Sequence, residues 1–85
     1  MAEYKYKFSP KSLKQLAKFP QDIQRRIFAK LDFFCQTNIL NYAERLTNSE
    51  LGQYRFRIGN YRIIFDVDGF MITILKIGHR REIYR

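Results

Sequence analysis

The last third of the sequence gathers basic and aromatic side chains around a single histidine. Arginine and lysine neutralise phosphate groups, an aromatic ring can stack on an unpaired base, and histidine can exchange a proton near neutral pH. Together these side chains suit the binding of a nucleic acid, with one group beside them that can exchange a proton. The candidate residues are Arg55, Arg57, Arg62, Lys76, His79, Arg80, Arg81, Tyr84 and Arg85.

Several of these residues also have a simpler interpretation. A lone histidine is more often a hydrogen-bonded structural residue than a catalyst, so His79 can simply cap the end of a strand. Arg81 and Arg85 can be solvated charges of the C-terminal tail. Composition by itself therefore supports a basic RNA-binding surface, and catalysis needs a further argument.

Residues 51–85 predict the strands that carry these side chains. Three apolar runs alternate with period two and are separated by Gly59-Asn60 and Asp68-Gly69, both of which are hairpin signals. With two-residue turns the predicted cross-strand pairs are Ile58–Tyr61, Phe56–Ile63 and Tyr54–Phe65, then Val67–Phe70, Phe65–Ile72 and Ile63–Ile74. This register sets Arg57 opposite Arg62, and opposed like charges cost about 0.2–1 kcal/mol. Either the two arginines converge on a polyanion, or both extend into water and reach an acid such as Asp66.

The preceding residues predict one strand and two helices. Residues 3–8 alternate as a strand, and Ser9-Pro10 then starts a helix because serine caps the first turn and proline fits inside it. Pro20 ends that helix and opens a second one, and residues 36–50 form a looser connection. The expected fold is α+β, in the order β-α-α-β-β-β, with both helices on the apolar face of a small antiparallel sheet. The opposite face is expected to stay open, carrying Arg55, Arg57, Arg62, Ile64, Asp66, Met71, Thr73 and Leu75.

Length and composition limit the possible functions. The 85 residues fit one domain, residues 1–85, and the net charge of +8 favours nucleic acid or another acidic partner. No apolar stretch of about 18 residues is present, and the N-terminus lacks the apolar segment of a signal peptide. A lone cysteine, Cys35, indicates a reducing compartment, so a cytoplasmic location is expected, and Cys35 itself is expected to be a small buried side chain. One histidine and one cysteine do not form a metal site, so neither metal nor cofactor is expected.

Three motifs in combination resemble the RelE/ParE superfamily of type II toxins, and most closely its RelE-like branch. They are Tyr54-Arg55-Phe56-Arg57, Tyr61-Arg62, and Ile77-Gly78-His79-Arg80 followed by Tyr84. The resemblance covers nearly the whole chain, including the order of the elements.

The resemblance implies a ribosome-dependent endoribonuclease that cuts mRNA in the ribosomal A site without a metal. In that reaction the 2′-hydroxyl attacks the adjacent phosphate and leaves a 2′,3′-cyclic phosphate and a free 5′-hydroxyl. An arginine stays protonated, so it would stabilise charge on the phosphate, whereas His79 could transfer a proton. The catalytic positions implied are Arg57, Arg62, His79, Arg80 and Tyr84. The RNA-binding positions implied are Arg55, Lys76, Arg81 and Arg85.

Two other functions remain open on the same sequence. A ParE-like toxin would share the fold and poison DNA gyrase by protein contact, and a non-catalytic module would only bind RNA or a partner. For the nuclease, the expected partners are the ribosome with its mRNA, through contacts to 16S ribosomal RNA, and a cognate antitoxin, while the free toxin is expected to be monomeric. The positive charge and the apolar residues Ile64, Met71 and Leu75 suit an acidic amphipathic antitoxin segment.

Overall fold

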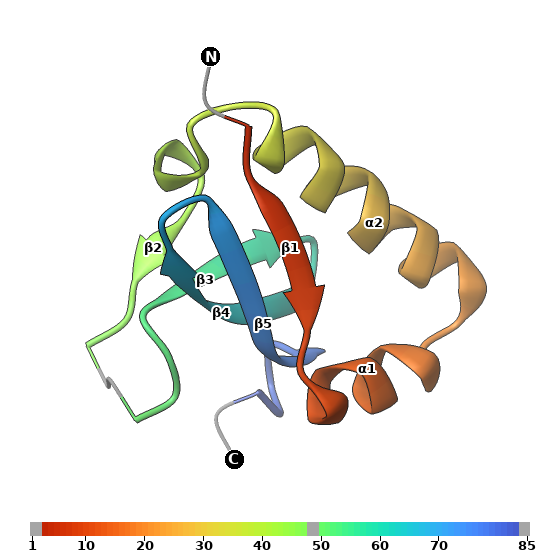
Figure 1. The fold of residues 1–85 in the computed structure, drawn as a ribbon. Coiled ribbons are helices and arrows are strands. Elements are labelled where there is room, and N and C mark those ends of the chain that lie inside the picture. The colour runs from red at the N-terminus through yellow and green to blue at the C-terminus, as the bar shows by residue number, and fades with distance from the viewer. Residues whose placement is uncertain (1–2, 48–49, 84–85) are drawn as a thin grey trace.

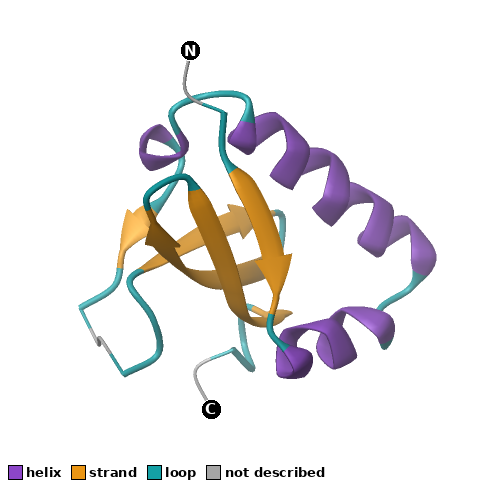
Figure 2. Cartoon of the chain, viewed as in Figure 1, coloured by secondary structure: helices purple, strands orange, loops and turns teal. Residues whose placement is uncertain are grey.

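A computed structural model describes residues 3–47 and 50–83, and these form two helices and a sheet (Figures 1 and 2). The elements in chain order are β1 (Lys5–Phe8), α1 (Pro10–Ala17), α2 (Gln21–Cys35), the 3-10 helix η1 (Ile39–Asn41), β2 (Glu44–Arg45), β3 (Tyr54–Ile58), β4 (Tyr61–Asp68) and β5 (Met71–His79). The predicted α+β class is confirmed, and so is the predicted order of a strand, two helices and then the strands of the two hairpins. No helix in the described part of the chain is long and apolar enough to cross a membrane.

The sheet is mixed, whereas the sequence predicted an antiparallel one. Its strand order is β1-β5-β4-β3-β2, and β1 runs parallel to β5 while every other pair is antiparallel. The alternating pattern of residues 3–8 indicates a strand but carries no information on its direction. The two-residue strand β2 was also not predicted, because it is too short to show a period.

Helix α1 protects the edge of β5 that β1 leaves uncovered. Ser9 caps α1, since its hydroxyl accepts a hydrogen bond from the Ser12 amide at 3.1 Å, as the sequence predicted. Ser12 is fully buried and its hydroxyl donates to the Ile74 carbonyl at 2.9 Å. Gln15 accepts from the Ile77 amide at 2.8 Å. Side chains of α1 therefore satisfy the polar backbone groups of an otherwise exposed strand edge.

The core lies between α2 and the sheet. Ile27, Leu31 and Phe34 of α2 are buried against Phe56 and Phe65, whose rings stack at 4.3 Å. Cys35 lies in the same core, and burial raises the pKa of its thiol to about 11, so the expected structural role of this cysteine is confirmed.

The first hairpin has the predicted register and the second does not. Ile58 pairs with Tyr61 across the first turn, and Arg57 lies directly opposite Arg62. In the second hairpin the turn is Gly69-Phe70 rather than Asp68-Gly69, so Asp68 pairs with Met71. Gly69 takes the left-handed conformation with φ 60°, and a hairpin turn with glycine in its first central position tolerates an ordinary residue in the second.

A β-bulge in β5 then changes which side chains share a face. Phe65 pairs with Ile74 but Ile64 pairs with Lys76, so Leu75 is an extra residue. Side chains alternate between the two faces along a strand, so the extra residue moves every later side chain of β5 to the face opposite the one predicted. The pairs beyond the bulge are Ile63–Ile77, Arg62–Gly78 and Tyr61–His79.

The face opposite the helices is partly covered, whereas the sequence predicted that it would stay open. Ile64 is fully buried there, because the loop at Gly52 packs closely on its side chain. A Cβ built on Gly52 would lie only 2.6 Å from that side chain. Gln53 fastens the same loop, with its amide donating to Asp66 at 2.9 Å. Ile83, from the C-terminal turn, packs against Gly78 and is also buried. Two side chains that the helices do not cover, Ile64 and Ile83, are therefore buried by the loop at Gly52 and by the C-terminal turn.

Candidate functional site

Three arginines from adjacent strands form a basic surface on the face opposite the helices, which we call the arginine face: Arg55, Arg57 and Arg62. Arg57 and Arg62 are paired across β3 and β4, so both guanidinium groups leave the sheet on the same side. The side chain of Arg57 is 57% accessible, compared with 24% for that of Arg55. A negatively charged ligand that approaches this face meets both groups together.

Glu44 of β2 orients two of these arginines and was missed by the sequence analysis. Its carboxylate accepts hydrogen bonds from Arg55 at 2.8 Å and from Arg57 Nη2 at 3.3 Å, and Arg57 Nε lies 2.6 Å from its other oxygen, so one acid bridges both side chains. The hydrogen bond from Arg55 and the nearby positive charges, including Arg62, lower the pKa of Glu44 below its usual value. The only sequence signal was an acid in a loosely patterned region, with nothing to indicate that a short strand would place it beside β3.

The turn between β3 and β4 binds the side chain of Arg62, and a fourth arginine lies beside this turn. The guanidinium of Arg62 donates to the Gly59 carbonyl at 3.0 Å and to its neighbour Tyr61 at 2.9 Å. Arg26 of α2 reaches the same turn, since a Cβ built on Gly59 would lie 3.3 Å from its guanidinium. Sequence patterning gave no reason to connect Arg26 with the arginine face, because it lies on a helix about 30 residues earlier.

His79 does not join the arginine face. Because of the bulge it pairs with Tyr61, on the opposite side of the sheet from Arg62, and the two rings lie 5.7 Å apart. Its Nδ1 accepts a hydrogen bond from the Arg81 amide at 3.2 Å, which leaves the proton of the neutral ring on Nε2. The expectation that the tail brings His79 to the same patch as Arg57 and Arg62 is therefore wrong.

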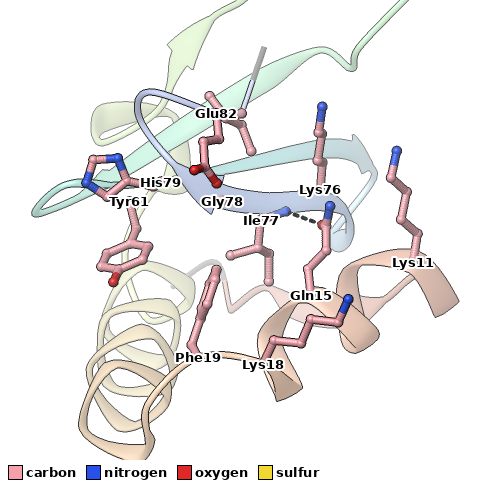
Figure 3. Close-up of a pocket in the computed structure, with 11 residues that line it drawn as sticks. Lys11, Gln15, Lys18, Phe19, Tyr61, Lys76, Ile77, Gly78, His79 and Glu82 are labelled. Carbon is pink, nitrogen blue, oxygen red and sulfur yellow. Dashed lines mark hydrogen bonds between the residues drawn. The ribbon is translucent and has the colours of Figure 1, made fainter. Parts of the chain in front are cut away.

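His79 instead lines a pocket of about 500 Å³ between α1 and the end of β5, which we call the His79 pocket (Figure 3). Tyr61 and His79 stand at one end of this pocket and the lysines of α1 stand at the other, with Phe19 between them. The rings of Phe19 and Tyr61 are 5.1 Å apart. The charged and aromatic side chains that line it include Lys11, Lys18, Phe19, Tyr61, His79 and Glu82.

Comparison with known proteins gives the family of this chain. A family model described as the ParE toxin of type II toxin–antitoxin system, parDE, matches residues 6–84. The chain belongs to the RelE/ParE superfamily of type II toxins. A curated member, Toxin RelE3 of Methanocaldococcus jannaschii, is 32% identical over 80 residues and is covered over 91% of either chain.

Solved structures of RelE toxins share the fold. The RelE–RelB complex from Pyrococcus horikoshii OT3 matches with TM-score 0.74 and 26% identity over 96% of this chain and 99% of that chain. The RelB–RelE complex from Methanococcus jannaschii matches with TM-score 0.70 and 30% identity over 91% and 93%. The RelBE2 complex from Mycobacterium tuberculosis matches with TM-score 0.70 and 24% identity over 92% and 99%, which supports the fold alone.

The remaining predicted site residues of the toxin are dispersed. The Arg80 amide donates to the Asn60 carbonyl at 2.7 Å, which holds the start of the tail at the β3–β4 turn, and the side chains of Arg80 and Arg81 are exposed. Lys76 pairs with Ile64 across the strands and lines the rim of the His79 pocket. Tyr84 and Arg85 lie outside the described residues, so their predicted roles stay predictions.

Proposed function

We propose that this toxin is a ribosome-dependent endoribonuclease that cuts mRNA in the ribosomal A site and so stops translation. The observation that carries the proposal is the Arg57–Arg62 pair. Opposed like charges weaken a sheet, yet here Glu44 and backbone carbonyls hold both groups in place. Fixed cations on one surface are what stabilisation of a charged phosphate requires.

In the proposed reaction, the 2′-oxygen of the mRNA forms a bond to the adjacent phosphorus while the bond to the 5′-oxygen breaks. The 2′-hydroxyl loses its proton and the departing 5′-oxygen gains one, which gives the cyclic phosphate and a free hydroxyl. Arg57 and Arg62 donate hydrogen bonds to the non-bridging oxygens, where negative charge increases in the transition state. Neither arginine serves as base or acid, since a guanidinium keeps its proton at any working pH.

Arg80 and Arg55 have supporting roles in this proposal. The Arg80 backbone is fixed at the β3–β4 turn, so its exposed side chain starts close to Arg62 and can contact the same phosphate or the next one. Arg55 shares the Glu44 carboxylate with Arg57 and helps to hold that acid in place. No metal is assigned a role in these steps.

Cleavage is proposed to need the ribosome, because the arginine face is small and the chemistry requires an mRNA strand held in line for attack. The test uses purified toxin and a programmed ribosome with an occupied P site, and 5′-end mapping reads the cuts. The expected result is cutting at the A-site codon and little cutting of the same mRNA without ribosomes. Efficient cutting of free mRNA at many sites would contradict ribosome dependence.

ParE-like inhibition of DNA gyrase is the second candidate, because the family model that matches the chain describes ParE toxins. Such a toxin acts by protein contact and does not need a fixed pair of arginines facing solvent. Trapped gyrase–DNA cleavage complexes after induction of the toxin, with mRNA left intact, would favour this candidate over the nuclease.

A cognate antitoxin is proposed as the protein partner, since the solved RelE relatives are complexes with RelB. The +8 charge favours an acidic segment. Ile64 is buried and therefore not part of the contact surface proposed from the sequence, whereas Met71 is 37% exposed. Co-expression with the protein encoded beside this gene should give a stable complex by size exclusion, and a toxin that never associates with that neighbour would argue against the assignment.

A further inference from the structure

The His79 pocket has the composition of a site for a single unpaired nucleotide. One end presents the rings of Tyr61 and His79, with Phe19 beside them, and the other end presents the α1 lysines (Figure 3). Aromatic faces stack on bases, and lysines neutralise phosphates. The volume of about 500 Å³ lies within the range of pockets that hold small organic ligands.

We infer that the His79 pocket is a second nucleotide subsite of the toxin, separate from the arginine face. The base would lie against Phe19 and Tyr61, and the phosphate would lie between Lys11 and Lys18. This inference rests on the proposed function, since it gives the RNA a place to continue beyond the phosphate that is cut. In this inference His79, which lies beside Tyr61, contacts the base and does not transfer a proton.

The position of the pocket fits one RNA strand that passes around the end of the sheet. Arg62 and Tyr61 are neighbours in β4, so their side chains point to opposite faces. The phosphate at Arg62 and the base at Tyr61 would thus be separated by about the thickness of one strand. Arg26 and Arg80 lie at the intervening β3–β4 turn and provide positive charge along this path.

The polar groups of the pocket favour a base over an acidic peptide. Glu82 is the one acid among the described residues that line it, and it stands across from Phe19. A carboxylate there accepts a hydrogen bond from an exocyclic amine of a base and repels the carboxylates of an acidic segment. Because Nδ1 of His79 accepts from the Arg81 amide, Nε2 is the ring nitrogen that can donate to a base carbonyl or ring nitrogen.

The experiment is a titration of the free toxin with adenosine 5′-monophosphate, followed by the amide resonances of the protein. We expect the largest shifts at Lys18, Phe19, Gly78 and His79. Adenosine alone and inorganic phosphate alone should each bind about tenfold more weakly, because each reaches only one end of the pocket. A hexaglutamate peptide is the fourth ligand and should not displace the nucleotide.

Two lysine variants on the same helix separate the pocket from general charge. Lys18→Gln should weaken nucleotide binding about tenfold, as expected for the loss of one charge-assisted hydrogen bond. Lys14→Gln removes an equal charge from α1 but does not line the pocket, so it should bind like the unmodified toxin. Equal losses in both variants, shifts confined to the arginine face, or displacement by the peptide would overturn the inference.

A third variant distinguishes this inference from the proposed nuclease. Arg62→Ala should slow cutting on the ribosome about a hundredfold and leave nucleotide binding in the pocket unchanged. If the unmodified toxin cuts mRNA but no nucleotide enters the pocket, the subsite is wrong and the nuclease stands. If the nucleotide binds but no mRNA is cut, the nuclease is wrong and the pocket still binds nucleotides.

Discussion

The arginines of the arginine face and the rings of Tyr61 and His79 lie on opposite sides of the same strand end, and the arginine face and the His79 pocket hold their cations in different ways. On the arginine face, Glu44 and the carbonyls of the β3–β4 turn fix the guanidinium groups. In the pocket the lysines are Lys11 and Lys18 of α1, which are exposed, and Lys76 of β5. Fixed donors need no reorganisation when charge develops on a phosphate, whereas flexible lysines adapt to a bound one. We therefore expect the chemistry on the arginine face and the binding of a nucleotide in the pocket.

The largest effect is expected from Arg62→Ala on the arginine face. Loss of one fixed donor to the phosphate should lower the rate of mRNA cutting on the ribosome about a hundredfold, or about 3 kcal/mol. Arg62→Lys should recover little of this loss, because lysine lacks the planar fork that bonds both backbone carbonyls and a phosphate oxygen. Undiminished growth arrest by Arg62→Ala would contradict the proposal that the arginine face carries out the cleavage.

The next effect concerns stability and the loop that covers Ile64. Gly52 has φ 150° and lies against Ile64, so a methyl group there meets a buried side chain at 2.6 Å. Gly52→Ala should lower the free energy of unfolding by about 1–3 kcal/mol, measured by urea denaturation. Gly69→Ala is the control, because Gly69 also has a positive φ but nothing lies within 4 Å of its added Cβ. A loss at Gly52 no greater than at Gly69 would show that the loop does not pack tightly on Ile64.

Glu44→Gln tests whether fixing the arginines matters for chemistry. The amide keeps the size of the side chain but weakens its hold on Arg57, so cutting should slow about threefold to tenfold, mainly in kcat. Glu3→Gln removes an exposed acid elsewhere and should cut normally. Faster cutting by Glu44→Gln would mean instead that the acid competes with the phosphate for the arginines.

The same acid also limits how cutting depends on pH. The pKa of Glu44 is lowered in the folded toxin, so its contribution to stability is complete above the usual carboxylate range. That contribution is lost only as the pH falls through the lowered value. Between about pH 5.5 and 8.5, Glu44 should therefore stay ionised, and any change in rate there must come from another group.

The division between the two regions was only partly predictable from the sequence. Gly59-Asn60 and strict alternation were sufficient to place Arg57 opposite Arg62, because a two-residue turn fixes the register. The bulge at Leu75 has no comparable sequence signal. An extra residue in a strand depends on how both faces of the sheet pack, which the local sequence does not show. That one residue turned His79 away from the arginines.

Two further features depended on contacts between distant segments. Glu44 reaches the arginines because β2 adds to the edge of β3, and two residues show no period. Ile64 is buried because Gly52 brings a loop over it, whereas its alternation alone marked it as exposed on the basic face. Tertiary contacts of this kind are not encoded in local patterns, so local rules recovered the strands and the basic residues but not their final grouping.

His79→Ala is expected to have an effect as small as that of Glu44→Gln, and it tests the boundary between the two regions. A histidine that donated the proton to the departing 5′-oxygen would have to stand beside Arg57 and Arg62, but its ring lies with Tyr61 on the other face. We therefore expect a loss of about threefold to tenfold that appears in KM more than in kcat, because a base loses a contact in the pocket. Single-turnover cutting on the ribosome between about pH 5.5 and 8.5 should keep the profile of the unmodified toxin. Lys14→Gln, on helix α1 but outside the pocket, should keep the KM of the unmodified toxin and serves as the control. A flattened profile with a large loss in the single-turnover rate would return proton transfer to His79 and require the RNA to bring its 5′-oxygen around the strand end.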